Sequence, residues 1–466
     1  MRTLTRATAV FRSLEERQQT VLQRIAWILL VWTALSTELA LAQNGTLPSW
    51  LLPPHHAEGV PDYTAALATG GLRPIRVPVA PVATDRFMLL HRDERTPDYL
   101  TSVRPKGIAS IPIPPPPLGE APAVVRGVYM NGWVFSSSRF FDLLSLADTT
   151  EINAFVIDVK DATGYITYRS SVSTAEEIGA NGLVRIRDPR SRLAILESHG
   201  IHPIARIVVA RDPLLAKNKP DWAIRDSVTG GLWRDGLGDA WVDAFNDSVW
   251  TYAADLAAEA VLMGFKEIQF DYVRFPDEPP QRLNRTVYPA RQAGESRRSA
   301  IRRSVNLLRE RVNALGVPFT LDVFGLAASA RGDLGIGQVW EDLSTAADVI
   351  LPMVYPSHYG RGAFGIPNPN RSPYEVVHRA MQDAVTRSAP MEYPARIRPY
   401  LQAFTIYRVR YGPAEVRAQI QAVEDAGLTD WILWNARGVY PPGALRPADP
   451  PAGVVEETRR ESGTGG

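Results

Sequence analysis

Residues 267–276 read Glu-Ile-Gln-Phe-Asp-Tyr-Val-Arg-Phe-Pro, an apolar run that ends in a carboxylate, a phenol and a guanidinium. The alternating apolar side chains, such as Ile268 and Phe270, predict a buried strand. Asp271 and Arg274 stand where that strand ends, and burying charges there is unfavourable unless they are paired or used. In a parallel α/β barrel the carboxyl ends of the strands carry the chemistry. The alternative interpretation is a structural ion pair between Asp271 and Arg274 at the rim of the barrel.

Seven further segments have the same strand-like character, and helical patterns lie between them. The eight predicted strands are 124–129, 155–158, 204–209, 268–273, 319–324, 349–355, 397–404 and 431–434. Apolar residues at helical spacing predict helices at 139–147, 189–198, 250–263, 295–314, 339–346, 374–387 and 413–426. This alternation predicts an α/β protein with a (β/α)8 TIM barrel. An open, doubly wound sheet is the alternative, but no glycine-rich phosphate loop follows the first strand.

The composition excludes several classes of function. The chain has 466 residues, is 45% hydrophobic and 22% charged, and carries a formal net charge of +1. Such a balance does not predict a nucleic-acid partner. The absence of Cys excludes disulfides, thiol nucleophiles and zinc bound by Cys. The seven His are scattered without the spacing of metal ligands, so we expect neither a metal nor a cofactor.

The two ends of the chain differ in amino-acid composition from the predicted barrel region. In residues 1–42, five Arg precede or flank the apolar segment 25–35, and an Ala-Leu-Ala sequence follows at 40–42. This pattern predicts a signal peptide or an N-terminal anchor, and hence an exported protein that is secreted, periplasmic or associated with the cell envelope. We expect membrane association only through this segment. Residues 43–123 read as a Pro-rich linker or arm, 124–441 as the barrel and 442–466 as a disordered tail.

Polar and aromatic side chains follow the predicted strands and are expected to meet in one cup. The cup has no Ser-His-Asp order, no thiol and no phosphate loop. In strand order, its candidate residues are Tyr129, Asn131, Trp133, Asp158, Lys160, Arg206, Asp271, Tyr272, Arg274, Asp322, Met353, Tyr355, Gln402, Trp434 and Asn435.

This mixture of side chains is typical of a carbohydrate site. Aromatic rings offer flat apolar faces to sugar rings, and cleavage of a glycosidic bond requires two carboxyl groups. Asp158, Asp271 and Asp322 can supply the pair. Asp158 and Asp322 each have a structural alternative: Asp158 holds Lys160 or Arg206, and Asp322 caps the following helix or binds backbone N–H groups.

A long loop after the third predicted strand, residues 211–240, carries further aromatic residues. It contains Trp222 and Trp233, and Trp241 follows directly. Loops of this length are usually functional or disordered, and the Trp content argues against disorder. We interpret Trp233 as a stacking residue along a glycan cleft. The alternative is a hydrophobic cluster that holds the loop in place.

Four motifs together resemble a known family. They are Asp-Val-Lys-Asp at 158–161, Trp-Ala-Ile-Arg-Asp with Gly-Gly-Leu-Trp-Arg-Asp within 222–235, Phe-Asp-Tyr-Val-Arg-Phe-Pro at 270–276 and Met-Val-Tyr-Pro at 353–356. In these motifs the chain resembles the bacterial "putative glycoside hydrolase domain" family, long catalogued as a domain of unknown function. The resemblance covers residues 124–440. It implies a TIM barrel, glycan chemistry with no settled sugar, and a key carboxylate at Asp271.

We therefore predict an exported glycoside hydrolase that acts on a polysaccharide or a cell-envelope glycan. Asp271 is expected to be the nucleophile or electrostatic stabiliser and Asp322 the proton donor, with Asp158 as runner-up. Arg274 is expected to keep Asp271 ionised, because a nearby positive charge lowers the pKa of a carboxylate. A carboxyl separation of about 5–5.5 Å would indicate retention of configuration, and one of roughly 6.5–9.5 Å inversion. The remaining candidates are assigned to substrate binding.

Two other functions stay open on the sequence. The first is a glycan-binding barrel at the cell surface without catalytic activity, which needs the aromatic residues and no poised pair of carboxylates. The second is a metal-dependent hydrolase or lyase that uses Asp158, Asp271 and Asp322 as oxygen ligands.

Overall fold

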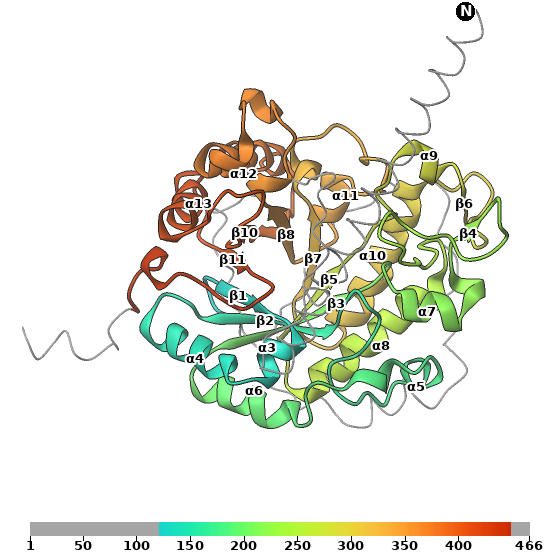
Figure 1. The fold of residues 1–466 in the computed structure, drawn as a ribbon, viewed down its shortest axis with the longest axis horizontal. Coiled ribbons are helices and arrows are strands. Elements are labelled where there is room, and N and C mark those ends of the chain that lie inside the picture. The colour runs from blue at the N-terminus through green and yellow to red at the C-terminus, as the bar shows by residue number, and fades with distance from the viewer. Residues whose placement is uncertain (1–120, 449–466) are drawn as a thin grey trace, which may run out of the picture. The chain divides into compact units, whose positions relative to one another are not determined.

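The computed structural model describes residues 121–448, which form a closed barrel of parallel strands (Figure 1). β11 pairs with β1, and β10 pairs with both β8 and β11, so the sheet has no free edge. In chain order the barrel strands are β1 (Arg126–Met130), β2 (Ala154–Lys160), β3 (His202–Val208), β5 (Glu267–Asp271), β7 (Phe319–Phe324), β8 (Val349–Val354), β9 (Arg396–Ile397), β10 (Tyr400–Gln402) and β11 (Trp431–Trp434). The predicted TIM barrel is confirmed, with β9 and β10 sharing the seventh strand position.

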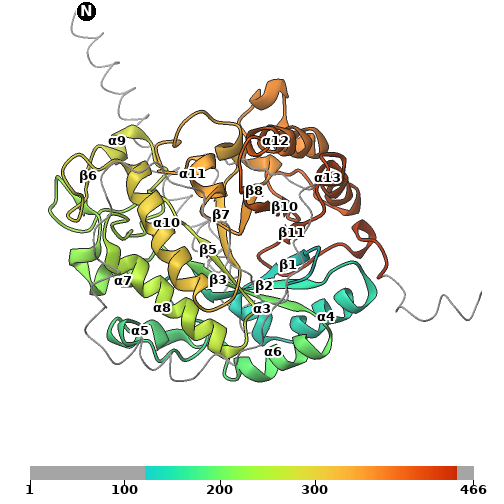
Figure 2. The same ribbon diagram turned by 180° about the vertical axis from the view of Figure 1, so that it is seen from behind.

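Helices surround the barrel on its outside, as the two opposite views show (Figures 1 and 2). The longer ones are α4 (Arg139–Thr149), α6 (Pro189–Ser198), α8 (Asp247–Met263), α10 (Arg297–Asn313), α12 (Pro373–Ser388) and α13 (Pro413–Asp425). The shorter ones are α3 (Gly132–Ser136), α5 (Ser173–Glu177), α7 (Pro213–Asn218), α9 (Pro280–Leu283) and α11 (Trp340–Ser344). The seven predicted helices are all present, with ends shifted by a few residues.

Local sequence signals explain where several helices begin. Asp188 and Asp212 each stand before a Pro, and each accepts a hydrogen bond from a backbone N–H three residues further on. This arrangement satisfies an N–H group that the first turn leaves without a partner, and Pro fits the first helical position. Ser296 forms a reciprocal capping box with Ser299 at the start of α10. The caps therefore fix the length of the loops that carry the candidate site.

Two predicted strands end differently in the structure, each for a local reason. The predicted strand 397–404 is divided into β9 and β10 around Arg398 and Pro399. Pro399 has no N–H to donate to a sheet ladder, so pairing is interrupted there. The predicted strand 268–273 ends at Asp271 because Tyr272 adopts a left-handed backbone with φ of 56°.

The inside of the barrel is a mixed apolar and polar core. A cluster of buried aromatic and aliphatic side chains from β1, β2, β3, β8, β10 and β11 fills it, including Tyr129, Val156, Ile204, Leu351, Tyr400 and Trp434. Gln269, Thr320 and Asp322 are also buried, on β5 and β7. The interior of the barrel therefore holds buried polar groups beside the apolar cluster.

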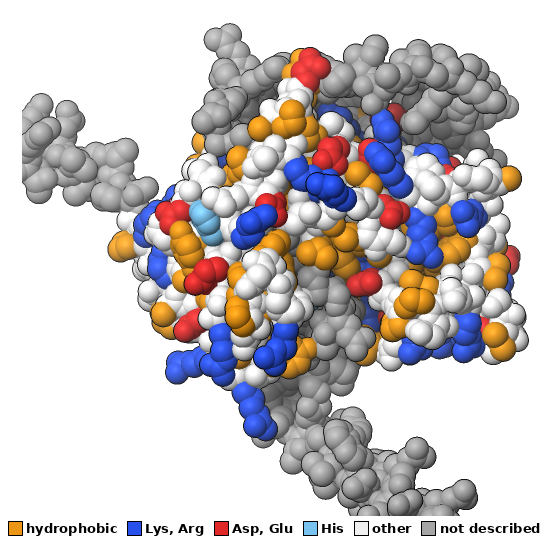
Figure 3. Space-filling view, turned by 90° about the horizontal axis from the view of Figure 1, so that it is seen from above, with side chains coloured by type: hydrophobic (Ala, Val, Ile, Leu, Met, Phe, Trp, Pro, Cys, Tyr) orange, Lys and Arg blue, Asp and Glu red, His pale blue; other side chains and the backbone are white. Residues whose placement is uncertain are grey.

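Charges of both signs are interspersed on the outer surface, as the face in Figure 3 shows. Many of them pair between neighbouring elements, for example Arg298 with Asp342 and Arg311 with Asp255. Within residues 121–448 no helix is both long and apolar enough to cross a membrane. The predicted signal peptide or anchor (1–42) lies outside the described residues. So do the Pro-rich arm up to residue 120 and the tail from residue 449.

Candidate active site

The guanidinium of Arg206 lies among three carboxylates at the centre of the barrel. Nη1 is 2.5 Å from Oδ1 of Asp158, Nη2 binds Oδ2 of Asp271, and Nε is 3.6 Å from Oδ2 of Asp322. The four residues stand on β2, β3, β5 and β7, which are consecutive neighbours in the sheet. All four are at most 5% exposed. The structure therefore brings the three predicted carboxylates together around a single cation.

Three further side chains hold these carboxylates in place. The Tyr129 hydroxyl donates to Oδ2 of Asp158 at 2.5 Å. Gln269 donates through Nε2 to Oδ2 of Asp322 at 2.8 Å, and the same nitrogen is 2.8 Å from the hydroxyl of Tyr400. Gln269 and Tyr400 were absent from the sequence-based candidates. The signal that could have identified Gln269 is a polar side chain two residues before Asp271, on the same face of an otherwise apolar strand.

The environment favours the protonated form of two of the carboxyl groups. Burial raises the pKa of Asp322 well above its ordinary value, and the charge of Asp271 adds to this effect. Burial also raises the pKa of Asp158, although Arg206 and the Tyr129 hydroxyl oppose the rise. One oxygen of Asp322, Oδ1, has no hydrogen-bond partner among the described residues. A carboxyl group of this kind suits proton donation.

Asp271 is held differently, by donors on both of its oxygens. Oδ2 accepts from Arg206, and Oδ1 accepts from the backbone N–H of Tyr272 at 2.5 Å. Tyr272 is a non-glycine residue in the left-handed region, a conformation that costs about 1–3 kcal/mol and is concentrated at functional sites. The turn directs a backbone donor at Asp271, which stabilises the carboxylate as an anion.

Stacked aromatic rings lie beside the carboxylates. Tyr129 and Trp434 stack with centroids 3.7 Å apart and an interplanar angle of 17°. The Arg206 guanidinium lies 5.1 Å from the Trp434 ring, and Tyr355 lies 6.4 Å from the same ring. The Tyr355 hydroxyl is buried and has no hydrogen-bond partner within residues 121–448. The rings therefore provide an apolar wall beside the polar centre.

The model of a glycosyl hydrolase family matches residues 127–440, described as "Putative glycosyl hydrolase domain". The chain belongs to this family. The match spans the whole barrel and confirms the resemblance seen in the four sequence motifs. No curated protein matches the chain.

Solved structures are similar to parts of this glycosyl hydrolase family member. A hypothetical protein from Ruminiclostridium thermocellum is 36% identical, with a TM-score of 0.38, over 43% of this chain and 98% of its own. An alpha-galactosidase from Thermus thermophilus is 17% identical, with a TM-score of 0.41, over 74% and 62%. The glycoside hydrolase domain of PelA from Pseudomonas aeruginosa is 12% identical, with a TM-score of 0.38, over 70% and 98%. Since these scores are low, the fold assignment rests on the strand order described above.

The charge that contacts Asp271 in this glycosyl hydrolase domain differs from the one we expected. Arg206 makes the ion pair, whereas Arg274 donates to the carbonyl oxygen of Phe275 at 3.0 Å. The reason is the left-handed turn at Tyr272, after which the chain no longer follows the strand. Arg274 instead lies 4.4 Å from the ring centroid of Phe324.

Three of the predicted sugar-binding residues use their side chains to bind the backbone. Asn131 caps α3 and donates to the carbonyl oxygen of Ala436 at 2.9 Å. Gln402 accepts from the N–H of Ser357, and Asn435 donates to the carbonyl oxygens of Ala403 and Val439. These contacts hold the loops after β1, β10 and β11 in place.

Two more candidates are likewise occupied by neighbouring groups. Lys160 is 2% exposed and pairs with Asp212 at 2.7 Å. Trp233 is 1% exposed, and its indole N–H donates to the carbonyl oxygen of Arg282 at 3.1 Å. This burial agrees with the alternative interpretation of the Trp-rich loop, a hydrophobic cluster that holds the loop.

Trp133 and Met353 keep partly exposed surface. The indole nitrogen of Trp133 has no hydrogen-bond partner in the described part of the chain, and the guanidinium of Arg185 lies 5.6 Å from its ring. Met353 packs against the apolar cluster inside the barrel. Of the two, Trp133 is the better placed to meet a ligand, since its ring carries a free donor.

The three aspartates do not form a metal site in the described residues. The guanidinium of Arg206 lies in the position between them that a cation would take. Nowhere in residues 121–448 do three His, Cys, Asp or Glu side chains converge as metal ligands do. This geometry argues against the metal-dependent alternative.

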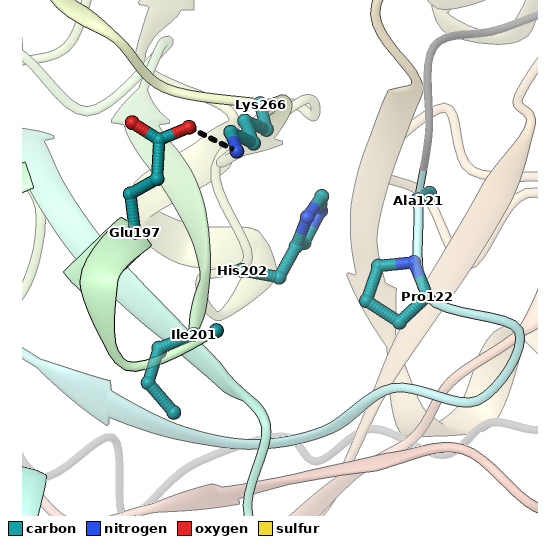
Figure 4. Close-up of a pocket in the computed structure, with 7 residues that line it drawn as sticks. Ala121, Pro122, Glu197, Ile201, His202 and Lys266 are labelled. Carbon is teal, nitrogen blue, oxygen red and sulfur yellow. Dashed lines mark hydrogen bonds and ion pairs between the residues drawn. The ribbon is translucent and has the colours of Figure 1, made fainter. Parts of the chain in front are cut away.

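A hollow of about 270 Å³ lies at the opposite end of the barrel from Asp271 (Figure 4). It is lined by His202, which begins β3, and by Lys266, which precedes β5. Ala121 and Pro122 face these residues, and Lys266 pairs with Glu197 at 2.8 Å. In TIM barrels this amino end contributes to stability, so the hollow is not the candidate active site.

Proposed function

We propose that this protein is a glycoside hydrolase that cleaves glycosidic bonds by a mechanism with two carboxyl groups. One observation carries the proposal: Asp271 and Asp322 share the Arg206 guanidinium on adjacent strands of a chain that belongs to a glycosyl hydrolase family. Such a pair can protonate the leaving oxygen on one side and stabilise or attack the anomeric carbon on the other.

Asp322 acts as the proton donor in this proposal. Burial and the neighbouring charge of Asp271 hold its proton at a pH where an exposed aspartate would have lost it. Gln269 binds one oxygen and leaves the other free to approach the glycosidic oxygen. Asp158 is less suited, because Tyr129 and Arg206 bind both of its oxygens.

Asp271 acts as the nucleophile or as the electrostatic stabiliser of the transition state. Donors from Arg206 and from the Tyr272 backbone bind both oxygens of the carboxylate and fix its orientation. A positive charge that develops at the anomeric carbon is stabilised by a fixed, buried anion. The stacked rings of Tyr129 and Trp434 supply an apolar face for the sugar.

The substrate class that we propose is a polysaccharide or a cell-envelope glycan, met outside the cytoplasm. This part of the proposal depends on residues 1–42, whose five Arg, apolar segment and Ala-Leu-Ala sequence predict export. A fusion of these residues to a reporter that folds only after export, compared with the same fusion carrying two Asp within the apolar segment, tests it.

The competing function is a glycan-binding barrel without catalytic activity. One observation favours it: the side chain of Asp271 is 4% exposed and both of its oxygens are already bonded within the protein. A binding module needs the aromatic wall and no carboxyl group that reaches the glycosidic bond.

The substitution Asp271→Asn distinguishes the two functions. It keeps the shape of the side chain and removes the anion, so we expect kcat/KM for a hydrolysed glycan to fall by about three orders of magnitude or more. Glycan binding, measured by calorimetry, is expected to persist. Hydrolysis that is unchanged in the variant contradicts the role of Asp271. Tight binding by the wild-type protein, without hydrolysis of any glycan in a broad panel, favours the binding module.

A further inference from the structure

Arg274 is the one buried arginine of residues 121–448 that makes no ion pair with another described residue. Five arginines are buried in this part of the chain: Arg185, Arg206, Arg211, Arg274 and Arg398. The other four each lie within 4 Å of at least one carboxylate oxygen. Arg274 is 5% exposed, and its recorded hydrogen bond is to a backbone carbonyl, that of Phe275. A buried charge without a partner is costly, so such a group is kept where it is used.

Aromatic rings enclose the Arg274 guanidinium on several sides. Its central carbon lies 4.4 Å from the ring centroid of Phe324, 4.8 Å from that of Tyr272 and 5.1 Å from that of Trp241. Such contacts fix the plane of the guanidinium and leave its N–H groups directed along that plane. These contacts hold the guanidinium in position without neutralising its charge.

The position of Arg274 is one layer above the two proposed catalytic groups. It follows Asp271 by three residues, and Phe324 follows Asp322 by two residues on the same face of β7. Phe324 therefore stands between Asp322 and the carboxyl-end rim of the barrel, with Arg274 against it. Because ligands enter TIM barrels from the carboxyl-end rim, we expect a sugar bound at Asp271 and Asp322 to approach past Phe324 and Arg274.

The charge of the centre makes an unpaired cation here useful. Arg206 already contacts three carboxyl groups, so it is not available to bind the carboxylate of an acidic sugar that enters the cup. Burial lowers the pKa of Arg274, and the neighbouring Asp277 and Asp271 oppose this effect without cancelling it. A carboxylate from outside the protein would supply the missing counter-charge, and the arginine fork matches a carboxylate with two parallel hydrogen bonds.

We propose that Arg274 binds the carboxylate of an acidic sugar, so that the glycan cleaved at this site contains a uronic acid. This inference rests on the proposed function and specifies its substrate class. It assigns Arg274 to substrate specificity, in place of the role in ionising Asp271 that its sequence position suggested.

The test compares acidic sugars with neutral ones of the same linkage. Short oligosaccharides of galacturonic, glucuronic and mannuronic acid are prepared, each beside the product in which the carboxylates are reduced to hydroxymethyl groups. Binding is measured by calorimetry in the Asp271→Asn background, where no cleavage disturbs the titration. We expect at least one acidic oligosaccharide to bind on the order of tenfold or more tightly than its reduced counterpart.

The substitution Arg274→Met then identifies the residue responsible. It is expected to weaken binding of the acidic oligosaccharide by about ten- to a hundredfold and to leave binding of the reduced one within about twofold. Arg274→Lys keeps the charge but not the fork, so an intermediate loss is expected. Arg291→Met is the matched control, because Arg291 also lies over an aromatic ring, at 5.5 Å from Phe245, but is exposed.

The outcomes separate this inference from the proposed function. If no acidic oligosaccharide binds more tightly than its reduced form, or if Arg274→Met weakens both equally, Arg274 is structural and the inference is overturned. Cleavage of reduced oligosaccharides by the wild-type protein in that case leaves the hydrolase function standing. Selective binding of an acidic oligosaccharide that the wild-type protein never cleaves supports the inference and contradicts the hydrolase function.

Discussion

The two ends of the barrel both bury charged side chains, with opposite effects on protonation. At the amino end, Glu267 is fully buried, pairs with Arg398 and lies 3.2 Å from His202. Burial acts against its charge, but Arg398 and His202 prevail and lower the pKa of Glu267 to about 2. At the carboxyl end, burial and the charge of Asp271 raise the pKa of Asp322 well above its ordinary value.

The ratio of cations to carboxylates explains this difference. Glu267 has two basic neighbours, Arg398 and His202, of which Arg398 also lies 3.8 Å from Asp430, whereas Asp158, Asp271 and Asp322 share a single cation, Arg206. Where neighbouring positive charge outweighs the cost of burial, a carboxyl group is held ionised and adds to stability. Where it does not, the carboxyl group keeps its proton to a higher pH. The amino end is thus arranged for stability, and the carboxyl end has the arrangement that the proposed acid–base chemistry requires.

Replacing Arg206 by Met is expected to have the largest effect. Three buried carboxylates lose their cation, so the free energy of unfolding at neutral pH should fall by about 3–5 kcal/mol or more. Without Arg206 the folded-state pKa values of Asp158 and Asp322 rise further above those of the unfolded chain. Stability is then present at low pH and is lost as the pH rises. Denaturant unfolding followed between pH 4 and 8 checks this.

The outcome that contradicts this account is a loss of stability in Arg206→Met that is the same at every pH. Arg311→Met provides the control, since Arg311 pairs with the partly exposed Asp255 at 2.6 Å. An exposed pair of that kind contributes about 0–1 kcal/mol, so the control should unfold almost as the wild-type protein does.

At the amino end, Glu267→Gln is expected to destabilise the fold by about 3–5 kcal/mol, because Arg398 is left buried without its main partner. The pH dependence has the opposite sign to that of Arg206→Met. A lowered pKa means that Glu267 contributes stability above its unfolded value near 4.5 and loses it as the pH falls towards 2. The variant should lack this loss of stability at low pH, while kcat and KM of the folded protein stay unchanged.

Glu197→Gln is the control at the same end of the barrel. Glu197 pairs with Lys266 at the surface and its side chain is 67% exposed, so the loss should be within about 1 kcal/mol. Equal destabilisation by the two substitutions would mean that burial of the ion pair is not the cause.

Asp322→Asn tests the carboxyl end of the barrel through its effect on kcat and on the pH–rate profile. Loss of a general acid lowers kcat by about 10²–10⁴ for glycosides with poor leaving groups. Aryl glycosides with acidic leaving groups need less protonation and should lose much less. The pKa of Asp322 is higher in the folded than in the unfolded protein. The contribution of Asp322 to stability is therefore present at low pH and is lost as the pH rises from the unfolded pKa through the folded pKa. The variant should lose this dependence, together with the alkaline limb of the pH–rate profile.

Asp348→Asn is a matched control for Asp322→Asn. Asp348 also has a pKa raised by burial, but its carboxylate accepts from Phe319 N–H and Asn313 outside the candidate site. A change of the pH–rate profile in this control as large as that in Asp322→Asn would mean that the profile reports folding.

The sequence predicted the barrel and the positions of the three carboxylates for one physical reason. Strands and helices alternate with clear periodicity, and polar residues at the ends of parallel strands converge. Asp158, Asp271 and Asp322 were therefore identified as one group before their geometry was known. The separation of their carboxyl groups was beyond the sequence, because it depends on barrel register and on the side-chain orientations that Arg206 imposes.

The residues that the sequence assigned less well are those whose role depends on backbone direction. Gln269 and Tyr400 lie within apolar strands, where a polar residue is not distinguished from a tolerated one. Arg274 was expected beside Asp271, but the left-handed Tyr272 directs the chain away. A left-handed residue other than Gly leaves no reliable mark in a sequence, so this turn required coordinates.

Tyr129→Phe is expected to have the smallest effect of these substitutions. The ring stack with Trp434 is preserved, and the hydrogen bond from the hydroxyl to Asp158 is lost. A hydrogen bond to a charged group contributes about 1.5–3 kcal/mol, part of which Asp158 recovers by keeping its proton. Since this bond lowers the pKa of Asp158, its loss should raise that pKa, which an NMR titration of the Asp158 carboxyl group measures. Tyr411→Phe, which removes a buried bond of 3.1 Å to the carbonyl oxygen of Asn370, should change stability without changing the pKa of Asp158.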